Sequence, residues 1–206
     1  MTAVEVLGWT GTLTAILLGL PQLVRLARTR NVEGLSLPAW QAFLAVGVGW
    51  TAHGISIGQP PQVLASALSL ASTVPILYLL SRQLGRNFLW TLVPGLVLAA
   101  VMILVDQLFG SAAYGAVAII PAVLANAGQS VALIRSEHVR GVSVLFLILA
   151  VLNQVVWLTW AILVADLGTI IAAGTTGVIA LFNLFWYTAR RMGVPALGTV
   201  PERSPV

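Results

Sequence analysis

The sequence predicts an all-α membrane protein with seven transmembrane helices, arranged as two parallel three-helix bundles joined by a linker helix. Three observations predict this fold. Hydrophobic residues make up 59% of the 206 residues and charged residues only 8%, with a mean hydropathy of +0.99. Seven apolar segments are long enough to cross a bilayer, and residues 17–50 recur, after a shift of 107 positions, as residues 124–157. A soluble domain is about half apolar and a quarter charged, whereas a bilayer accepts this composition as outward-facing helix surface.

An α-helix needs about twenty apolar residues to cross a hydrocarbon layer of about 30 Å. The predicted spans are residues 4–26, 37–57, 60–81, 87–108, 112–134, 142–164 and 167–189. Arginine-bearing connections alternate with connections that lack lysine and arginine, as the positive-inside rule requires. We therefore expect a plasma (inner) membrane protein of bacterial type, with its N-terminus outside and its C-terminus in the cytoplasm. Residues 192–206, with three prolines and no apolar period, are expected to form a disordered cytoplasmic tail.

The repeat decides how the seven spans are grouped. It aligns Ser36 with Ser143 and Trp50 with Trp157, so the first three spans match the last three and the fourth is a linker. Because one span intervenes, both copies enter the bilayer in the same direction. They are therefore expected to be parallel repeats related by an axis along the membrane normal. The expected domains are residues 1–83 (first bundle), 84–110 (linker helix), 111–191 (second bundle) and 192–206 (tail).

Composition and motifs exclude several kinds of protein. The net charge is +4, but the arginines stand in short loops between apolar runs, which favours membrane orientation over nucleic-acid binding. There is no cysteine, no nucleophile–base pair, no cluster of metal ligands and no phosphate-binding glycine loop. We therefore expect neither an enzyme nor a bound cofactor or metal. The expected partners are a small-molecule substrate and the lipid bilayer, and assembly into a homo-oligomer is left open.

Two tryptophans lie at one predicted depth. Trp50 and Ser66 each stand eight residues from the turn between their helices, as do Trp157 and Ala173 in the second copy. Eight residues of helix rise about 12 Å, which places all four near the bilayer midplane. An indole there offers a flat apolar face and one N–H donor to a solute. The alternative, a lipid-interface anchor, is disfavoured by this depth and by recurrence in both copies, so these positions are candidates for the substrate site.

Polar residues within the spans extend this candidate site. Asn126 and Asn153 are amides deep in apolar helices and should face the bundle interior, where they either join helices or contact substrate. His53 lies one turn beyond Trp50, where it either closes an outer gate by bonding to Trp160 or Asp166, or sits at headgroup level. No Asp, Glu, Lys or Arg falls in the middle third of a span, which favours passive transport, with His53 as the only candidate proton carrier.

A family likeness rests on four features taken together. They are the Pro21-Gln22 pair, the basic loop after it, the run from Trp50 to Gly54 and the repeat of the whole unit. They resemble the PQ-loop superfamily and, within it, the SWEET and SemiSWEET sugar transporters. The resemblance covers all seven predicted spans. It implies a facilitative sugar carrier (uniporter) that works by alternating access, in which two three-helix bundles rock around a central cavity.

The resemblance also implies roles for particular residues. Trp50 and Trp157 match the cavity tryptophan of the family. His53, Trp160 and Asp166 stand at gate positions, with Gln59 replacing the acidic residue in the first copy. Pro21 and Gln22 match the hinge, and the second copy has Gln129 there without the proline.

The sequence departs from the family at the sugar-binding asparagine. The corresponding positions are Ser66 and Ala173, and neither supplies an amide's paired donor and acceptor. This leaves two alternatives on the same fold: a carrier of an amino acid or flat vitamin, and a receptor that transports nothing.

Overall fold

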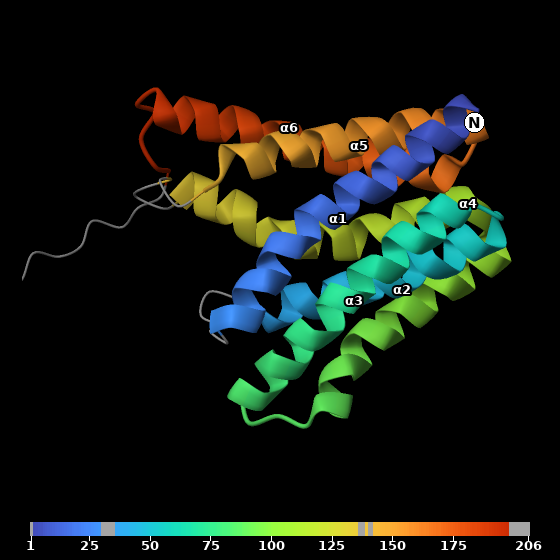
Figure 1. The fold of residues 1–206 in the computed structure, drawn as a ribbon, viewed down its shortest axis with the longest axis horizontal. Helices are drawn as coiled ribbons and strands as arrows, with labels where there is room; N and C mark the ends of the chain where they lie inside the picture. Colours follow the sequence, from blue (N-terminus) through green and yellow to red (C-terminus); the bar gives the residue numbers. More distant parts are fainter. Residues whose placement is uncertain (1, 30–35, 136–138, 140–141, 198–206) are drawn as a thin grey trace, which may run out of the picture.

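A computed structural model of the chain describes residues 2–29, 36–135, 139 and 142–197, without the side chains of residues 19–23, 25–27, 29, 125 and 127. Every regular element in these residues is a helix (Figure 1). The helices are α1 (Ala3–Thr29), α2 (Leu37–Ser56), α3 (Pro60–Gln83), α4 (Phe88–Arg135), α5 (Val144–Val164) and α6 (Leu167–Arg191). These bounds lie within a few residues of the predicted spans.

The longest helix is two helices joined at a kink. Within α4, Gly110 has φ 80° and ψ 178°, a backbone conformation that is essentially restricted to glycine. The kink divides α4 into a first half (residues 88–109) and a second half (residues 111–135), which correspond to the predicted fourth and fifth spans. The expectation of an all-α protein with seven helices is therefore confirmed for the described residues.

Helices at equivalent places in the two repeats begin alike. Ser36 caps α2 and Ser143 caps α5, each accepting a hydrogen bond from a backbone amide three residues further on. Such a cap satisfies one of the backbone donors left free at a helix start. Asp166 caps α6 in the same way, whereas its counterpart Gln59 makes no side-chain cap before α3. The sequence repeat is thus also a repeat of local structure.

Several of the described helices have the length and the surface of membrane spans. By length and composition, four segments can cross a bilayer: Pro60–Gln83, Phe88–Leu124, Val144–Val164 and Leu167–Arg191. Ala3–Leu18 of α1 is apolar but shorter, and α2 is not among the four. Large apolar side chains point outward, including Trp90 at 75% exposure and Phe185 at 66%. Such a surface suits lipid better than water, so the chain is a multi-pass membrane protein.

The helices form two groups of three. In the first group α3 packs against both α1 and α2, and in the second α6 packs against both α4 and α5. The groups meet where α1 packs against α5 and where Trp50 of α2 contacts Tyr114 in the second half of α4, while α2 also packs against the first half of α4. The helices lie close together at the end that holds the N-terminus and spread apart toward the opposite end (Figure 1).

Residues related by the repeat make related contacts. A Cβ placed on Gly8 of α1 would lie 2.9 Å from Cβ of Pro61 in α3. A Cβ placed on Gly115, which is 107 residues after Gly8, would lie 2.7 Å from Cα of Gly168, which is 107 residues after Pro61. In each group the first and third helices therefore touch at their N-terminal ends. Gly8 also lies against Trp160, so both groups begin at the same end of the molecule.

The described residues after α6 contact the end of α4. Beyond α6, the backbone amide of Leu197 donates to the carbonyl oxygen of Ile134 at 2.9 Å, so residues 192–197 fold back onto the end of α4. The expectation of a disordered tail from residue 192 stays a prediction. The rest of the predicted tail, residues 198–206, lies outside the described residues.

The close approach of α4 and α6 gives a stability prediction. We expect Gly115→Ala to lower the free energy of unfolding by about 1–3 kcal/mol, because the added methyl would press on the backbone of Gly168, which cannot move aside as a side chain could. Gly128→Ala in the same helix is the matched control, since a Cβ there meets nothing within 4 Å. Thermal unfolding in detergent, followed by tryptophan fluorescence, measures both variants. Equal melting temperatures for the two variants would contradict this packing.

Candidate functional site

A cavity of about 600 Å³ lies between the two groups of helices. All six helices line it, but α4 contributes residues only from its second half, so the linker helix takes no part. The described lining residues are apolar or neutral polar side chains, and none is Asp, Glu, Lys, Arg or His. A volume of this size is typical of sites for small organic ligands. The cavity can therefore hold a small uncharged solute.

The six residues predicted to bind substrate all line this cavity. They are Trp50, Ser66, Asn126, Asn153, Trp157 and Ala173. The structure thus brings together side chains from α2, α3, α4, α5 and α6 that lie far apart in the sequence.

The two predicted tryptophans face inward, each supported by a second aromatic ring. The ring of Trp50 meets Tyr114 edge-on at a centroid distance of 4.9 Å, and the ring of Trp157 meets Trp160 edge-on at 5.3 Å. Edge-to-face packing of this kind holds an aromatic ring in a defined orientation. Both indoles are partly buried and border the cavity, so neither is a lipid-interface anchor.

The two predicted asparagines differ in their partners. Asn153 of α5 accepts a hydrogen bond from the hydroxyl of Thr14 in α1 at 2.8 Å, which joins the two groups of helices. Asn126 donates at 2.7 Å to the carbonyl oxygen of Ala122 in its own helix. Each amide therefore has a protein partner and still borders the cavity, so joining helices and contacting a solute are compatible roles.

The predicted hinge is only partly described. Pro21 and Gln22 lie within α1, but their side chains are outside the described part of the structure. Gln129, the counterpart of Gln22, borders the cavity together with Asn126.

A cluster of hydrogen-bonded polar residues closes one end of the molecule. His53 of α2 is buried between two aspartates. Its Nδ1 lies 2.8 Å from Oδ2 of Asp106 in the first half of α4, and its Nε2 lies 3.2 Å from both carboxylate oxygens of Asp166. Ser111, just after the kink, donates to Asp166. We call His53, Asp106, Ser111 and Asp166 the closed-end cluster.

The closed-end cluster contains one of the two alternative contacts considered for His53. His53 meets Asp166, as predicted, but it makes no hydrogen bond to Trp160, whose fully buried indole N–H has no partner. The second partner of His53, Asp106, is not among the predicted contacts. Its position near the outer end of the fourth span, at the level of Asp166, was the available signal. An ionised carboxylate only accepts hydrogen bonds, so His53 must donate from both ring nitrogens when both aspartates are ionised.

Asp166 has a perturbed pKa. Burial alone would raise the pKa of this carboxyl, but hydrogen bonds from the side chains of His53 and Ser111 outweigh that effect and hold the pKa below its ordinary value of 3.8. Asp166 therefore stays ionised at neutral pH, where it also caps α6.

The cavity runs from the two tryptophans toward the end away from the closed-end cluster. Its lining includes Trp40, Gln129, Phe146 and Asn183, whereas no member of the closed-end cluster borders it. This is also the direction in which the helices spread apart (Figure 1). The chain thus encloses a central cavity that is sealed at one end.

Part of the chain matches a known family of repeats. Residues 3–63 match the family model of the PQ loop repeat. No curated protein matches the chain. The matched segment contains α1, α2 and the start of α3, including Trp50 and His53. It supports a relation to the PQ-loop superfamily and a carrier-type role in a membrane.

Proposed function

We propose that this protein is a facilitative transporter (uniporter) that moves a small neutral solute by alternating access, with a mono- or disaccharide as the first candidate substrate. The observation that carries the proposal is the central cavity, which lies between two repeat-related groups of helices and whose described lining reaches from beneath the two tryptophans toward the end away from the closed-end cluster. The match of residues 3–63 to the PQ loop repeat supports the same role.

The proposed cycle exchanges which end is closed. In the state described here, the closed-end cluster ties α2 to α4 and to the start of α6, and the cavity reaches toward the opposite end. Rocking of the two groups would break the bonds of His53 and bring the opposite ends of the helices together. Pro21, Gln22 and Gln129 are the proposed hinge. Small shifts at such an interface suffice, because packed groups of helices exchange between discrete arrangements.

The lining of the cavity indicates the class of solute. The described lining residues carry no charged side chain, so they offer no oppositely charged partner to the ammonium and carboxylate groups of an amino acid. A charge without a partner is unfavourable in such a site, so a sugar or a flat uncharged vitamin fits better. The open volume of about 600 Å³ favours transport over the receptor alternative, for which a filled interior is expected.

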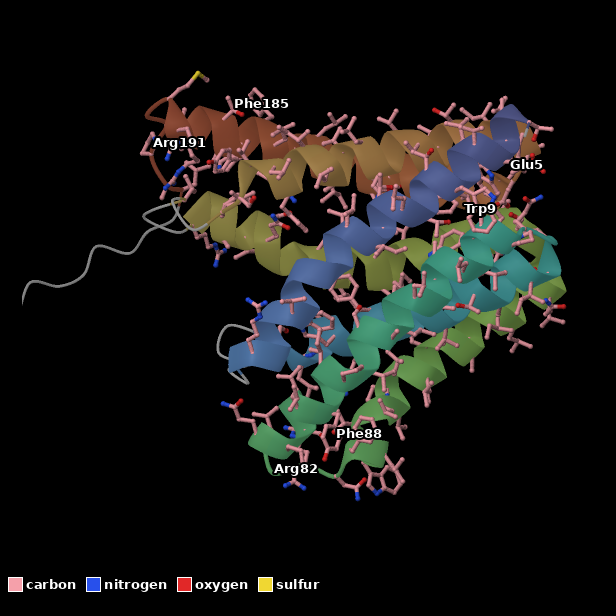
Figure 2. The ribbon with its side chains drawn as sticks, in the orientation of Figure 1. Glu5, Trp9, Arg82, Phe88, Phe185 and Arg191 are labelled. Carbon is pink, nitrogen blue, oxygen red and sulfur yellow. The ribbon has the colours of Figure 1, made fainter. Side chains whose placement is uncertain are left out.

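We further propose that the closed end faces outward in a plasma membrane. Glu5 and Trp9 lie at the end that holds the N-terminus (Figure 2). Arg82, near the C-terminal end of α3, and Arg191, at the C-terminal end of α6, lie away from it (Figure 2). Positive charge marks the cytoplasmic side of a membrane protein. Because the chain has no cysteine, labelling of Thr2→Cys in intact cells with an impermeant maleimide tests this orientation. Labelling only after cell lysis would show that the N-terminus and the closed end face the cytoplasm.

Transport is tested in proteoliposomes that contain the purified chain. We expect uptake of labelled glucose or sucrose down its gradient, without any ion gradient and unaffected by a proton ionophore, because no titratable side chain borders the described cavity. Competition by other sugars, vitamins and amino acids then identifies the preferred class. Uptake that requires a proton gradient would contradict the uniporter, and the absence of any solute flux would favour the receptor.

A further inference from the structure

The floor of the cavity contains buried polar atoms that have no hydrogen-bond partner in the described structure. Both amide atoms of Gln62 and the hydroxyl of Thr169 are in this state. The two residues are only 3% and 5% exposed, and both are among the residues that line the cavity. More than nine in ten buried polar groups in proteins are hydrogen-bonded, so these atoms require an explanation.

Gln62 and Thr169 are also equivalent in the repeat. Thr169 comes 107 residues after Gln62, and each stands twelve residues after the cavity tryptophan of its own repeat, Trp50 or Trp157. Gln62 lies in the first turn of α3 and Thr169 in the first turn of α6. They are one helical turn nearer to the closed end than Ser66 and Ala173. The two repeats thus place a polar side chain at the same point beneath the two indoles.

The missing partners are not explained by packing alone. Two other polar side chains that border the cavity have protein partners: Thr176 donates to Gln154 at 2.9 Å, and Asn183 accepts from Ser130 at 2.9 Å. The backbone amide of Thr169 also has a partner, Asp166. Among the described residues that line the cavity, Gln62 and Thr169 are the ones whose fully buried side-chain polar atoms have no partner. An unpaired buried polar group destabilises the empty protein, so its presence points to a partner that arrives from outside.

We propose that Gln62 and Thr169 form the polar part of the substrate site, with Trp50 and Trp157 as its apolar walls. The inference rests on the proposed transport function and assigns its site. A glutamine amide donates and accepts at once, which matches two neighbouring hydroxyl groups, and the threonine hydroxyl adds one further donor and acceptor. A change of side-chain rotamer brings the Gln62 amide to a solute in the cavity. The substrate class is an uncharged polyhydroxyl compound with a flat apolar face. This polar pair would replace the amides that Ser66 and Ala173 do not provide.

Stability and transport measured on the same variants test the assignment. Gln62→Met and Thr169→Val keep the approximate volume of each side chain and remove its unpaired polar atoms. We expect the empty variants to melt at the same temperature as the original chain or about 2–4 °C higher. For uptake of glucose in proteoliposomes we expect KM to rise by about three- to tenfold for each variant, the effect of losing a hydrogen bond to the solute.

Gln41→Met is the matched control. The Gln41 amide donates to the carbonyl oxygen of Thr91 at 2.7 Å, and Gln41 does not border the cavity. This variant should melt at a lower temperature and keep the original KM.

The possible outcomes distinguish a failure of the proposed transport function from a failure of the proposed substrate site. If the original chain transports no sugar, the proposed function fails and the assignment fails with it. If the original chain transports glucose while Gln62→Met and Thr169→Val keep its KM, the function stands and the assignment is wrong. If both variants melt at lower temperatures, as Gln41→Met should, the two side chains stabilise the fold and the assignment is also wrong. A higher KM without loss of stability supports it.

Discussion

Replacement of both cavity tryptophans by alanine is expected to abolish most of the solute flux. An aromatic ring stacked on a flat ligand contributes about 1–3 kcal/mol, so Trp50→Ala and Trp157→Ala should each lower flux at low substrate concentration about tenfold, and the double variant about a hundredfold. The expectation rests on both indoles bordering the same cavity from opposite groups of helices. Initial rates of glucose uptake in proteoliposomes measure the effect.

Two further variants show whether the lost flux reflects the site or the fold. Trp90 is 75% exposed on the outer surface, so Trp90→Ala removes an indole without touching the cavity and should leave flux unchanged. Trp50→Phe keeps an aromatic face and should recover part of the flux that Trp50→Ala loses. Normal transport by the double alanine variant would show that the cavity tryptophans do not contact the substrate.

Loss of the histidine from the closed-end cluster is expected to have the largest effect on stability. His53→Ala leaves the buried carboxylates of Asp106 and Asp166 without the group that lies between them. Removal of one partner from a buried ionic cluster destabilises a protein by about 3–5 kcal/mol. For a chain of this size we expect the melting temperature in detergent to fall by about 10 °C.

A variant without carboxylates provides the control. In the triple variant His53→Ala, Asp106→Asn, Asp166→Asn, neutral amides replace the two carboxylates, and asparagine at position 166 still caps α6. We expect this variant to be more stable than His53→Ala alone, since the uncompensated charge is gone. If His53→Ala melts like the original chain, the cluster does not hold the closed end together.

Much of the fold could be predicted because membrane helices obey a length rule. Span limits such as 60–81 and 167–189 lie close to the observed α3 (Pro60–Gln83) and α6 (Leu167–Arg191), since each apolar run must match the thickness of the bilayer. The inward position of Trp50 and Trp157 was also predictable, because residue spacing gives depth along a helix and the repeat gives an equivalent position in the second copy.

Partners across helices were harder to predict. Spacing along a helix gives the depth of a residue, but it does not say which neighbouring helix that residue faces. His53 was therefore predicted to meet Trp160 or Asp166, and its shortest contact, with Asp106, was overlooked. The same limit applies to Gln62 and Thr169. Their types are ordinary for a membrane helix, and only the packed structure shows that their polar atoms lack partners at the floor of a cavity.

Hydropathy and periodicity are properties of the chain alone, so they were enough to predict the class of protein, the number and approximate limits of its helices and the pairing of its two repeats. The closed end, the side chains around the cavity and the unpaired polar atoms become visible only in the packed fold. These depend on how α1 packs against α5 and α2 against α4, and such contacts join residues that no local pattern relates.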